Sequence, residues 1–285
     1  VKNIGSGDRI PITPTAIMQG HFLDVFYVRE GYPIGAMFGY KTDGLYQCRD
    51  FSDFYDANGT FISDKAQQKA IYDNIKGNNG QFTLREGVVS RGNAVEPGYL
   101  KLKKQGEGDV ITSDDKVYLG SNEPKFFGGF TNRFSYKNVE LSIFLQFSYG
   151  NKLFNTNHAM LRGYNNYNIE QQYYDNMWTI DRQNAPLHIY SDNIGRQTAT
   201  ELQAEDASYL KIKEISFSYR LPKKAMRHLG VKGAKVFVSG INLFTFTKYS
   251  WYDPEFSSTN PLTGGLDKYS YPTARTFNAG FSIDL

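Results

Sequence analysis

The chain has 285 residues, of which 40% are hydrophobic and 21% charged, and its formal net charge is +3. Its mean hydropathy is −0.50, and its longest apolar run, Val25 to Val28, is far shorter than the roughly 20 residues of a membrane-spanning helix. A bundle of membrane helices is therefore excluded, and 21 Phe, 21 Tyr and 2 Trp argue against a disordered chain. The basic residues form no stripe, so nucleic-acid binding is not predicted.

The start of the chain and its single cysteine say little about compartment. Cys48 cannot form an internal disulfide and has no second cysteine at metal-ligand spacing. One thiol fits the cytosol and also envelope proteins that avoid cysteine. The chain opens at Val1 with neither an initiator methionine nor a signal segment. We therefore expect a mature or internal piece of a longer protein.

Strand patterns dominate the chain from its first third onward. Residues 22–28 and 37–46 are plausible strands with weak alternation. The clearest pattern is Val139 to Tyr149, whose odd positions are all apolar and whose even positions are polar except Phe144. Residues 126–136 alternate in the same way, and only two residues separate these runs. The pattern predicts a β-hairpin with one apolar face.

Three further strands are predicted in the last third of the chain. They cover Tyr209 to Leu221, Lys235 to Thr247 and Phe277 to Leu285. The first and the last have apolar residues at every second position, and the second is rich in Val, Phe, Ile and Thr. In the second of these the apolar phase switches at Gly240, which predicts a β-bulge there. Five strands are thus well supported.

The connections between strands alternate in length. The hairpin turn at 137–138 is minimal and 222–234 is compact, with a short helical pattern, whereas 150–206 and 248–273 are long. Loops beyond about 15 residues are uncommon in compact domains, but outer-membrane β-barrels have short turns on one side and long loops on the other. If the long loops are extracellular, the C-terminus is periplasmic. A soluble β-sandwich, whose apolar face is a core, remains the alternative, although aromatic residues at the strand ends favour the barrel.

Four groups of residues, in chain order, carry a family resemblance. They are Glu30–Gly35 with Phe38–Gly44; Gly128–Lys137 with Tyr149–Asn155; Ala207–Ile215 with Ser218-Tyr219 and Leu221-Pro222; and Val238–Gly240, Asn242–Thr245, Thr247–Tyr249, Tyr252–Glu255, Gly265–Asp267, Tyr271-Pro272 and Arg275–Phe277. Together they resemble motifs of the SusC/RagA family of TonB-dependent outer-membrane transporters, over about two-thirds of the chain.

The resemblance implies an all-β fold, a transmembrane antiparallel β-barrel of about 22 strands filled by a plug. Residues 1–285 would be the C-terminal part of the barrel domain, without the plug and the N-terminal strands. Because five to seven strands cannot close a barrel, and open sheet edges are not tolerated in lipid, we expect other polypeptide to supply the rest, either a separate nicked chain or a preceding segment.

The implied function is TonB-dependent import of an oligomeric nutrient, a glycan or a peptide, across the outer membrane. The implied partners are a SusD-like surface lipoprotein acting as a lid, outer-membrane lipid, and TonB acting through the missing plug. The alternative from another class is a soluble or surface-attached β-sandwich that binds glycans. A barrel enzyme is a third option, but the sequence has no nucleophile motif.

Two features depart from the family pattern. The resemblance implies an acidic, calcium-binding type of loop before Gly128, but in residues 104–115 Lys104 stands at the first ligand position and glycines occupy two later ones. We therefore expect a solvated turn at Asp114-Asp115 rather than a calcium site. The chain also ends at Leu285, where outer-membrane barrels usually carry an aromatic residue.

No catalytic, cofactor or metal site is predicted. The sequence has no nucleophile elbow, zinc-protease or phosphate-loop motif, and its four histidines, His21, His158, His188 and His228, are isolated. We expect neither an enzyme nor a bound cofactor.

The candidate substrate-binding residues are aromatic side chains of the two long loops, because flat rings with polar edges suit sugars and peptides. They are Tyr164, Tyr167, Trp251 and Tyr252, with Tyr173, Tyr174 and Trp178 as further aromatics. The alternative is that these rings pack the loops together or against a lid protein. Residues 169–178 predict a short helix, which favours packing for Tyr173 and Trp178.

Overall fold

The computed structural model describes residues 10–11, 25–92, 94–158, 168–190, 198–222, 224, 226, 230–256 and 261–284. The chain divides into two compact units. We call one the sheet unit, which comprises Ser121–Leu153, Glu205–Thr259 and Gly264–Leu285. The other is the loop unit, which comprises Val1–Gly120, Phe154–Ala204 and Asn260–Thr263.

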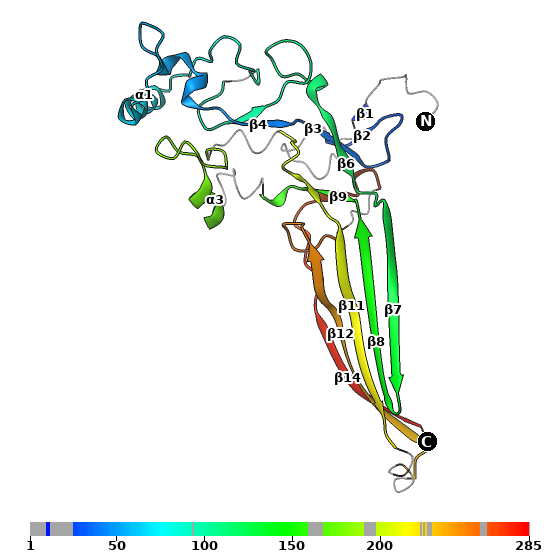
Figure 1. Ribbon diagram of the computed structural model, residues 1–285. Helices are drawn as coiled ribbons and strands as arrows, with labels where there is room; N and C mark the ends of the chain where they lie inside the picture. The colour runs from blue at the N-terminus through cyan, green and yellow to red at the C-terminus, as the bar shows by residue number, and fades with distance from the viewer. Residues whose placement is uncertain are drawn as a thin grey trace. The chain divides into compact units, whose positions relative to one another are not determined.

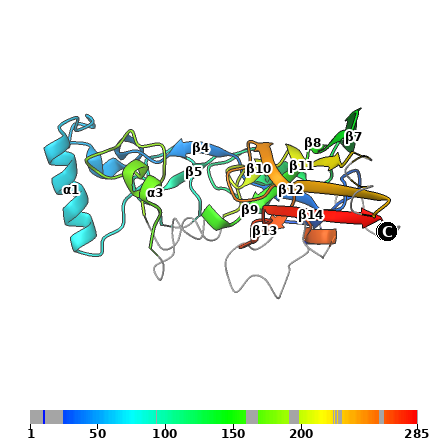
Figure 2. The ribbon, with the colours of Figure 1, turned by 90° about the horizontal axis from the view of Figure 1, so that it is seen from below.

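The sheet unit contains the five predicted long strands, which run side by side (Figures 1 and 2). They are β7 (Phe126–Tyr136), β8 (Val139–Tyr149), β11 (Tyr209–Arg220), β12 (Gly233–Thr247) and β14 (Thr276–Asp284). Their order is β14-β12-β11-β8-β7, and every neighbouring pair is antiparallel. The predicted hairpin is confirmed, with Lys137 in the turn at φ 51°.

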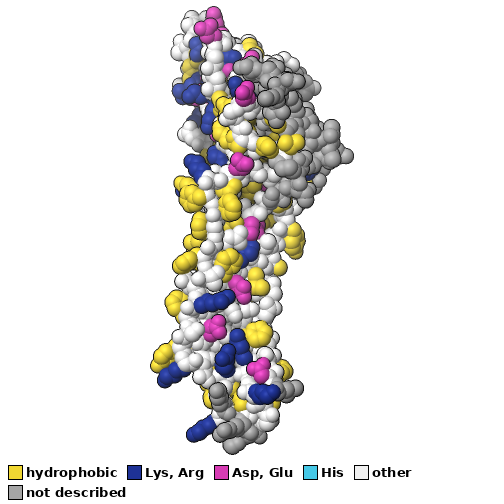
Figure 3. Space-filling model, turned by 90° about the vertical axis from the view of Figure 1, so that its right-hand side faces the viewer, with side chains coloured by type: hydrophobic (Ala, Val, Ile, Leu, Met, Phe, Trp, Pro, Cys, Tyr) yellow, Lys and Arg dark blue, Asp and Glu magenta, His cyan; other side chains and the backbone are white. Residues whose placement is uncertain are grey.

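At the middle of this sheet, the strand register places apolar side chains on one face and polar side chains on the other. One row across all five strands is apolar, and the next row is polar. The apolar row is Phe134, Leu141, Phe217, Val238 and Ala279; the polar row is Arg133, Ser142, Ser216, Ser239 and Asn278. Directly paired residues lie on the same face, and successive residues point to opposite faces. Figure 3 shows hydrophobic side chains along one margin of the strands, beside charged ones.

The apolar face is exposed rather than packed as a core. Phe130, Phe134, Phe244, Phe277 and Phe281 are each more than half exposed. In a β-sandwich this face would lie against a second sheet about 10 Å away. The exposure therefore agrees with a barrel wall whose apolar side faces lipid.

The predicted bulge at Gly240 is wrong in position. Gly240 pairs regularly with Ile215 and Phe277. The register shifts between Ile212 and Glu214 instead, so that Asn242 and Leu243 lie opposite one residue of β11. Asn242 has φ 56°, a conformation that asparagine tolerates better than most residues, and its side chain donates to the Ala274 carbonyl at 3.1 Å.

The remaining elements are short. The strands are β1 (Ile10–Pro11), β2 (Tyr27–Val28), β3 (Ala36–Gly39), β4 (Thr42–Leu45), β5 (Leu100–Leu102), β6 (Val117–Ser121), β9 (Lys152–Asn155), β10 (Ala204–Asp206) and β13 (Leu266–Asp267). The helices are α1 (Lys65–Gly77) and α3 (Gln171–Asn176), with 3₁₀ turns η1 (Cys48–Asp50), η2 (Ser52–Phe54), η3 (Ser113–Asp115) and η4 (Pro261–Thr263). In the part of the chain that the structure describes, no helix has the length and hydropathy of a membrane span.

The predicted strands at 22–28 and 37–46 are not members of the long sheet. Only β2, β3 and β4 form there, and all three are in the loop unit; residues 22–24 lie outside the described residues. The four residues of β3 are all buried, so this segment has no exposed polar face. Gly44, at φ 76°, breaks the extended run inside β4.

The loop unit has an aromatic core of its own. Its centre is formed by fully buried rings of Tyr46, Phe51, Phe54 and Trp178, and Tyr72 of α1 packs against it. Tyr173 of α3 is also fully buried. The predicted helix and the packing interpretation for Tyr173 and Trp178 are therefore confirmed.

Candidate functional site

The loop that follows β12 presents two of the predicted substrate-binding residues. Tyr252 is 65% exposed, whereas Trp251 is half-buried. Their ring centroids are 4.7 Å apart at an interplanar angle of 59°, so the two rings form one contiguous aromatic surface. The other two predicted residues, Tyr164 and Tyr167, lie outside the described residues, and Tyr174 is exposed on α3.

One ring of this aromatic pair, Trp251, packs on a buried apolar cluster. The cluster is formed by Leu153, Ala207 and Tyr249. The Tyr249 hydroxyl donates to Asp267 Oδ2 at 2.5 Å. Burial, together with this bond to a carboxylate, raises the pKa of Tyr249 well above its ordinary value. The phenol thus stays protonated, and the start of the loop stays tied to β13.

A buried lysine anchors the residues that follow Tyr252. Lys211 of β11 is 1% exposed, and its Nζ donates to Asp253 Oδ1 at 3.1 Å and to Glu255 Oε2 at 2.6 Å. Lys213 Nζ reaches the same Glu255 oxygen at 2.9 Å. Two ammonium groups therefore face two carboxylates, and the cluster is neutral. A buried lysine is tolerated only with such partners.

Further hydrogen bonds fix the two carboxylates in place. Gln146 Nε2 of β8 donates to Glu255 Oε1 at 3.1 Å, and Thr273 Oγ1 donates to Asp253 Oδ2 at 2.5 Å. Burial opposes the ionisation of Asp253 and Glu255. The hydrogen bonds from Thr273 and from the Glu255 amide, together with Lys211, hold the pKa of Asp253 below its ordinary value, and Lys211 and Lys213 hold the pKa of Glu255 below its own. We call Lys211, Lys213, Asp253 and Glu255 the loop anchor.

The sheet register explains why the loop anchor forms. Lys211 pairs directly with Gln146, so both side chains lie on the polar face. In the loop, the Glu255 amide donates to Asp253 Oδ1 at 3.0 Å across Pro254, a local turn that directs both carboxylates to one place. The sequence-based prediction missed these residues. A lysine in the polar row of a strand, with two acids flanking a proline in the next long loop, was the available signal.

The segment 104–115 forms an internal ion pair rather than a solvated turn. Asp115 is 1% exposed and accepts from the backbone amides of Gln105 and Thr112, while Lys104 Nζ lies 2.9 Å from it. Burial opposes ionisation, but these donors hold the pKa of Asp115 well below its ordinary value. The solvated turn is therefore wrong for Asp115, although Asp114 is exposed. Among the described residues, no group of three or more His, Cys, Asp or Glu could hold a metal ion.

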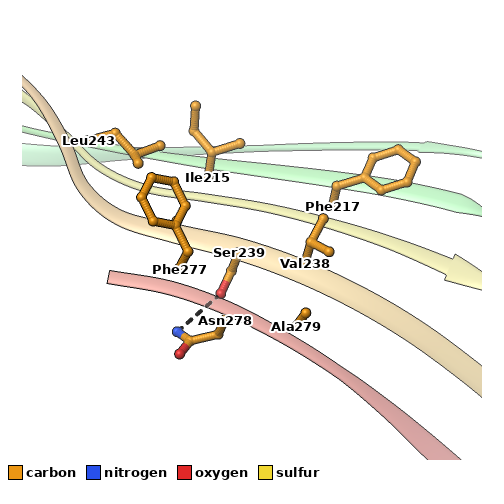
Figure 4. A pocket seen from close by; sticks show the side chains of 9 residues that line it. Ile215, Phe217, Val238, Ser239, Leu243, Phe277, Asn278 and Ala279 are labelled. Carbon is orange, nitrogen blue, oxygen red and sulfur yellow. Dashed lines mark hydrogen bonds between the residues drawn. The ribbon is translucent and has the colours of Figure 1, made fainter. Parts of the chain in front are cut away.

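An apolar hollow of about 410 Å³ lies on the exposed apolar face of the sheet unit. Figure 4 shows its lining residues around the strands β11, β12 and β14. Its only drawn polar contact joins Asn278 Nδ2 to Ser239 Oγ at 3.5 Å. The hollow forms because Gly240 and Ala279 have little or no side chain, whereas the neighbouring Phe217 and Phe277 carry large rings that rise above the sheet. Its polar lining residues, Ser239 and Asn278, belong to the polar row of the sheet and pair with each other, so the aromatic pair remains the better candidate site.

The comparisons with known proteins agree with this architecture. No protein-family model matches the chain. TonB-dependent receptor P3 of Formosa agariphila is 29% identical over 93% of the chain, and TonB-dependent receptor SusC of Bacteroides thetaiotaomicron is 25% identical over 83%. The chain spans only 24% and 22% of the lengths of these curated relatives.

Solved structures show the same fold. The structure of the RagAB peptide transporter matches 91% of the chain with a TM-score of 0.62 at 18% identity. The matched region is 23% of the length of the transporter's chain. A second structure, of the RagAB peptide importer in its "open-open" state, matches 98% with a TM-score of 0.61.

Fold and relatives together point to one class: the five-stranded sheet has the fold of part of a transmembrane β-barrel, and the chain is similar to TonB-dependent receptors. Within that class the chain is similar to the C-terminal portion of SusC/RagA-family transporters, as its motifs predict.

Proposed function

We propose that residues 1–285 are the C-terminal part of the barrel domain of an outer-membrane importer. The observation that carries this proposal is the sheet of β14-β12-β11-β8-β7, which has one exposed apolar face and one polar face. An apolar face of this extent suits lipid. Among the residues that the structure describes, the end strands β7 and β14 each pair with a single strand, and open edges are not tolerated in a bilayer. The rest of the receptor would complete the barrel.

In this proposal the receptor imports an oligomeric nutrient, an oligosaccharide or a peptide, and the chain has no catalytic role. The support is the similarity to proteins named as TonB-dependent receptors and as a peptide transporter. The partners would be a SusD-like surface lipoprotein, outer-membrane lipid and, through the plug, TonB. The long loops would be extracellular and the C-terminus periplasmic.

Within this function, Trp251 and Tyr252 would contact the substrate. Their adjoining rings, held by the loop anchor, offer a flat surface with polar edges, which suits a sugar ring or a peptide side chain. Tyr164 and Tyr167 remain candidates on sequence grounds alone.

Two experiments test the proposal. The full receptor, expressed in an outer membrane, should shift its gel mobility when unboiled, as a barrel does, whereas a soluble sandwich should not. Uptake of labelled oligosaccharides and peptides should require TonB, and Tyr252→Ala should reduce uptake of the true substrate. Tyr136→Ala is the matched control, because Tyr136 is also mostly exposed, at 72%, but lies beside the β7–β8 hairpin turn at the other end of the strands. Uptake that is independent of TonB would refute the function.

A further inference from the structure

Residues 248–275, which lie between β12 and β14, expose charged side chains of one sign only. We call them the β12–β14 segment. The segment contains as many acidic as basic residues: Asp253, Glu255 and Asp267 against Lys248, Lys268 and Arg275. All three basic residues are exposed, whereas none of the three acidic residues is. A ligand at the surface of this segment would therefore meet positive charge.

The three acidic side chains are bonded inside the protein. Asp253 and Glu255 belong to the loop anchor, in which Lys211 Nζ donates to both. Asp267 is fully buried, and its Oδ2 accepts from the Tyr249 hydroxyl at 2.5 Å. These carboxylates hold the segment in place and are not offered to a ligand.

The same segment exposes three tyrosine rings. Tyr252, Tyr269 and Tyr271 are 65%, 54% and 90% exposed. Tyr269 also has φ 57°, a strained conformation for a large side chain, and strained residues cluster at ligand-binding sites. The segment thus combines flat rings, whose edges carry hydroxyl groups, with positive charge.

A hydrogen bond ties the two halves of the segment together. Thr273 Oγ1 donates to Asp253 Oδ2 at 2.5 Å. Tyr252 directly precedes Asp253, and Tyr271 lies two residues before Thr273. Because consecutive Cα atoms are about 3.8 Å apart, this bond keeps the Cα atoms of Tyr252 and Tyr271 within about 20 Å of each other. One oligomeric ligand can therefore reach both rings.

Arg275 is the cation best placed to meet such a ligand. Lys248 lies near the carboxylate of Asp206, outside the segment, which partly balances its charge. Arg275 is exposed, and among the described residues it forms no ion pair. It follows Thr273 by two residues, so the bond that positions Tyr271 positions Arg275 as well.

We propose that the β12–β14 segment binds an acidic oligosaccharide, a chain of sugar rings that carry carboxylate or sulfate groups. Tyr252 and Tyr271 would each stack on a sugar ring, and Arg275 would pair with an acidic group, since guanidinium groups bind oxyanions through parallel hydrogen bonds. An acidic peptide would satisfy Arg275 but has no ring in each unit for the tyrosines. This inference rests on the proposed import function and specifies its substrate class.

The test measures binding to the full receptor in detergent by isothermal titration calorimetry. The probes are hexasaccharides of galacturonate, of mannuronate and of sulfated galactose, two uncharged sugars (the methyl ester of the hexagalacturonate, and maltohexaose), and hexaglutamate. We expect at least one acidic hexasaccharide to bind at least tenfold more tightly than the uncharged sugars and hexaglutamate. Its affinity should fall as the salt concentration rises, because salt screens exposed charges.

Three variants assign the contacts. Tyr252→Ala and Tyr271→Ala should each weaken binding of that hexasaccharide at least fivefold, because one stacked ring is lost. Arg275→Gln should weaken it by a similar factor and reduce its dependence on salt. Arg220→Gln is the matched control, because Arg220 is also exposed but ends β11 at the other end of the strands. It should change neither quantity, and all four variants should keep the gel-mobility shift of the receptor.

Two results would overturn the inference. One is that no acidic hexasaccharide binds more tightly than the uncharged sugars and hexaglutamate. The other is that Tyr271→Ala and Arg275→Gln leave binding unchanged. TonB-dependent uptake of uncharged sugars or peptides alone would refute the acidic substrate but leave the import function standing. Uptake that is independent of TonB would refute the import function and this inference with it.

Discussion

Lys211 and Asp253 are 42 residues apart in sequence, yet the Lys211 ammonium lies 3.1 Å from an Asp253 carboxylate oxygen in a buried ion pair. This contact joins the polar face of a long strand to the loop that presents Trp251 and Tyr252. The loop therefore has a fixed attachment to the sheet, and its aromatic pair has a defined position. The consequences can be measured.

Removing the buried lysine should release the loop. Lys211→Met keeps the length of the side chain but leaves two carboxylates without their main partner, which costs about 3–5 kcal/mol for a buried pair. Lys213→Met is the matched control, because Lys213 is 27% exposed and its loss should cost about 1 kcal/mol or less. Denaturant unfolding of the receptor in detergent measures both. Equal effects of the two variants would contradict a special role for Lys211.

The loop anchor should respond to acid. The pKa values of Asp253 and Glu255 lie below their ordinary values of 3.8 and 4.5. Groups with a lowered folded pKa stabilise the folded state above the ordinary value and lose that contribution as pH falls through the lowered one. In a variant of the full receptor in which every tryptophan except Trp251 is replaced by phenylalanine, Trp251 reports on the loop anchor. Its fluorescence should stay constant from pH 8 down to about pH 4.5, and change only in more acidic buffer. A transition near neutral pH would exclude these carboxyls as its cause.

The loop unit should be sensitive to a single methyl group at Gly98. This residue has φ 89°, and an added Cβ would lie 2.5 Å from a ring atom of the fully buried Trp178. Gly98→Ala combines backbone strain with a clash, and we expect a loss of about 3 kcal/mol or more in the unfolding free energy.

Gly59→Ala separates these two causes. Gly59 has φ 75° but open space around it, so this variant should show the backbone strain alone, about 1 kcal/mol. Thermal unfolding followed by near-ultraviolet circular dichroism measures the difference. Equal losses for both glycines would show that the contact with Trp178 is unimportant.

The thiol of Cys48 should be inert. Cys48 is buried, and burial raises its pKa to about 12. Only the thiolate reacts with alkylating reagents, so at pH 8 Cys48 of the native receptor should take up no iodoacetamide within hours, whereas Cys48 of the unfolded receptor should react within minutes, as peptide mapping of the labelled protein would measure. Fast labelling of the native protein would contradict the packing of the aromatic core around Cys48.

The long strands could be predicted because their information is local. Alternation over nine to fifteen residues fixes both the strand and its apolar face, so Val139–Tyr149 was predicted with its observed bounds. The bulge was misplaced because the sequence shows that the apolar phase changes but not which residue adopts a positive φ. Asn242, two residues after Gly240, can also adopt that conformation.

Long-range contacts explain what the sequence could not show. The loop anchor depends on Lys211 meeting Asp253 and Glu255 through a fold that only the whole sheet defines, and nothing near Lys211 in sequence indicates its partners. The core of the loop unit likewise joins Trp178 to Tyr46 and Phe51 across more than a hundred residues. Trp251 and Tyr252 could be predicted as candidate binding residues from their aromatic rings in a long loop, but the contacts that hold this loop could not be predicted.

The most direct test of the account is a spin-label scan of β8. Each residue from Val139 to Tyr149 is replaced by a labelled cysteine in a full receptor that carries Cys48→Ser and no other cysteine, and the receptor is reconstituted in lipid vesicles. Accessibility to oxygen, which concentrates in lipid, is compared with accessibility to a polar nickel complex. The account predicts high oxygen accessibility at every odd position, from Val139 through Phe147, and low values at the even positions between them. Oxygen accessibility without a period of two, or highest at the even positions, would contradict a lipid-facing barrel wall.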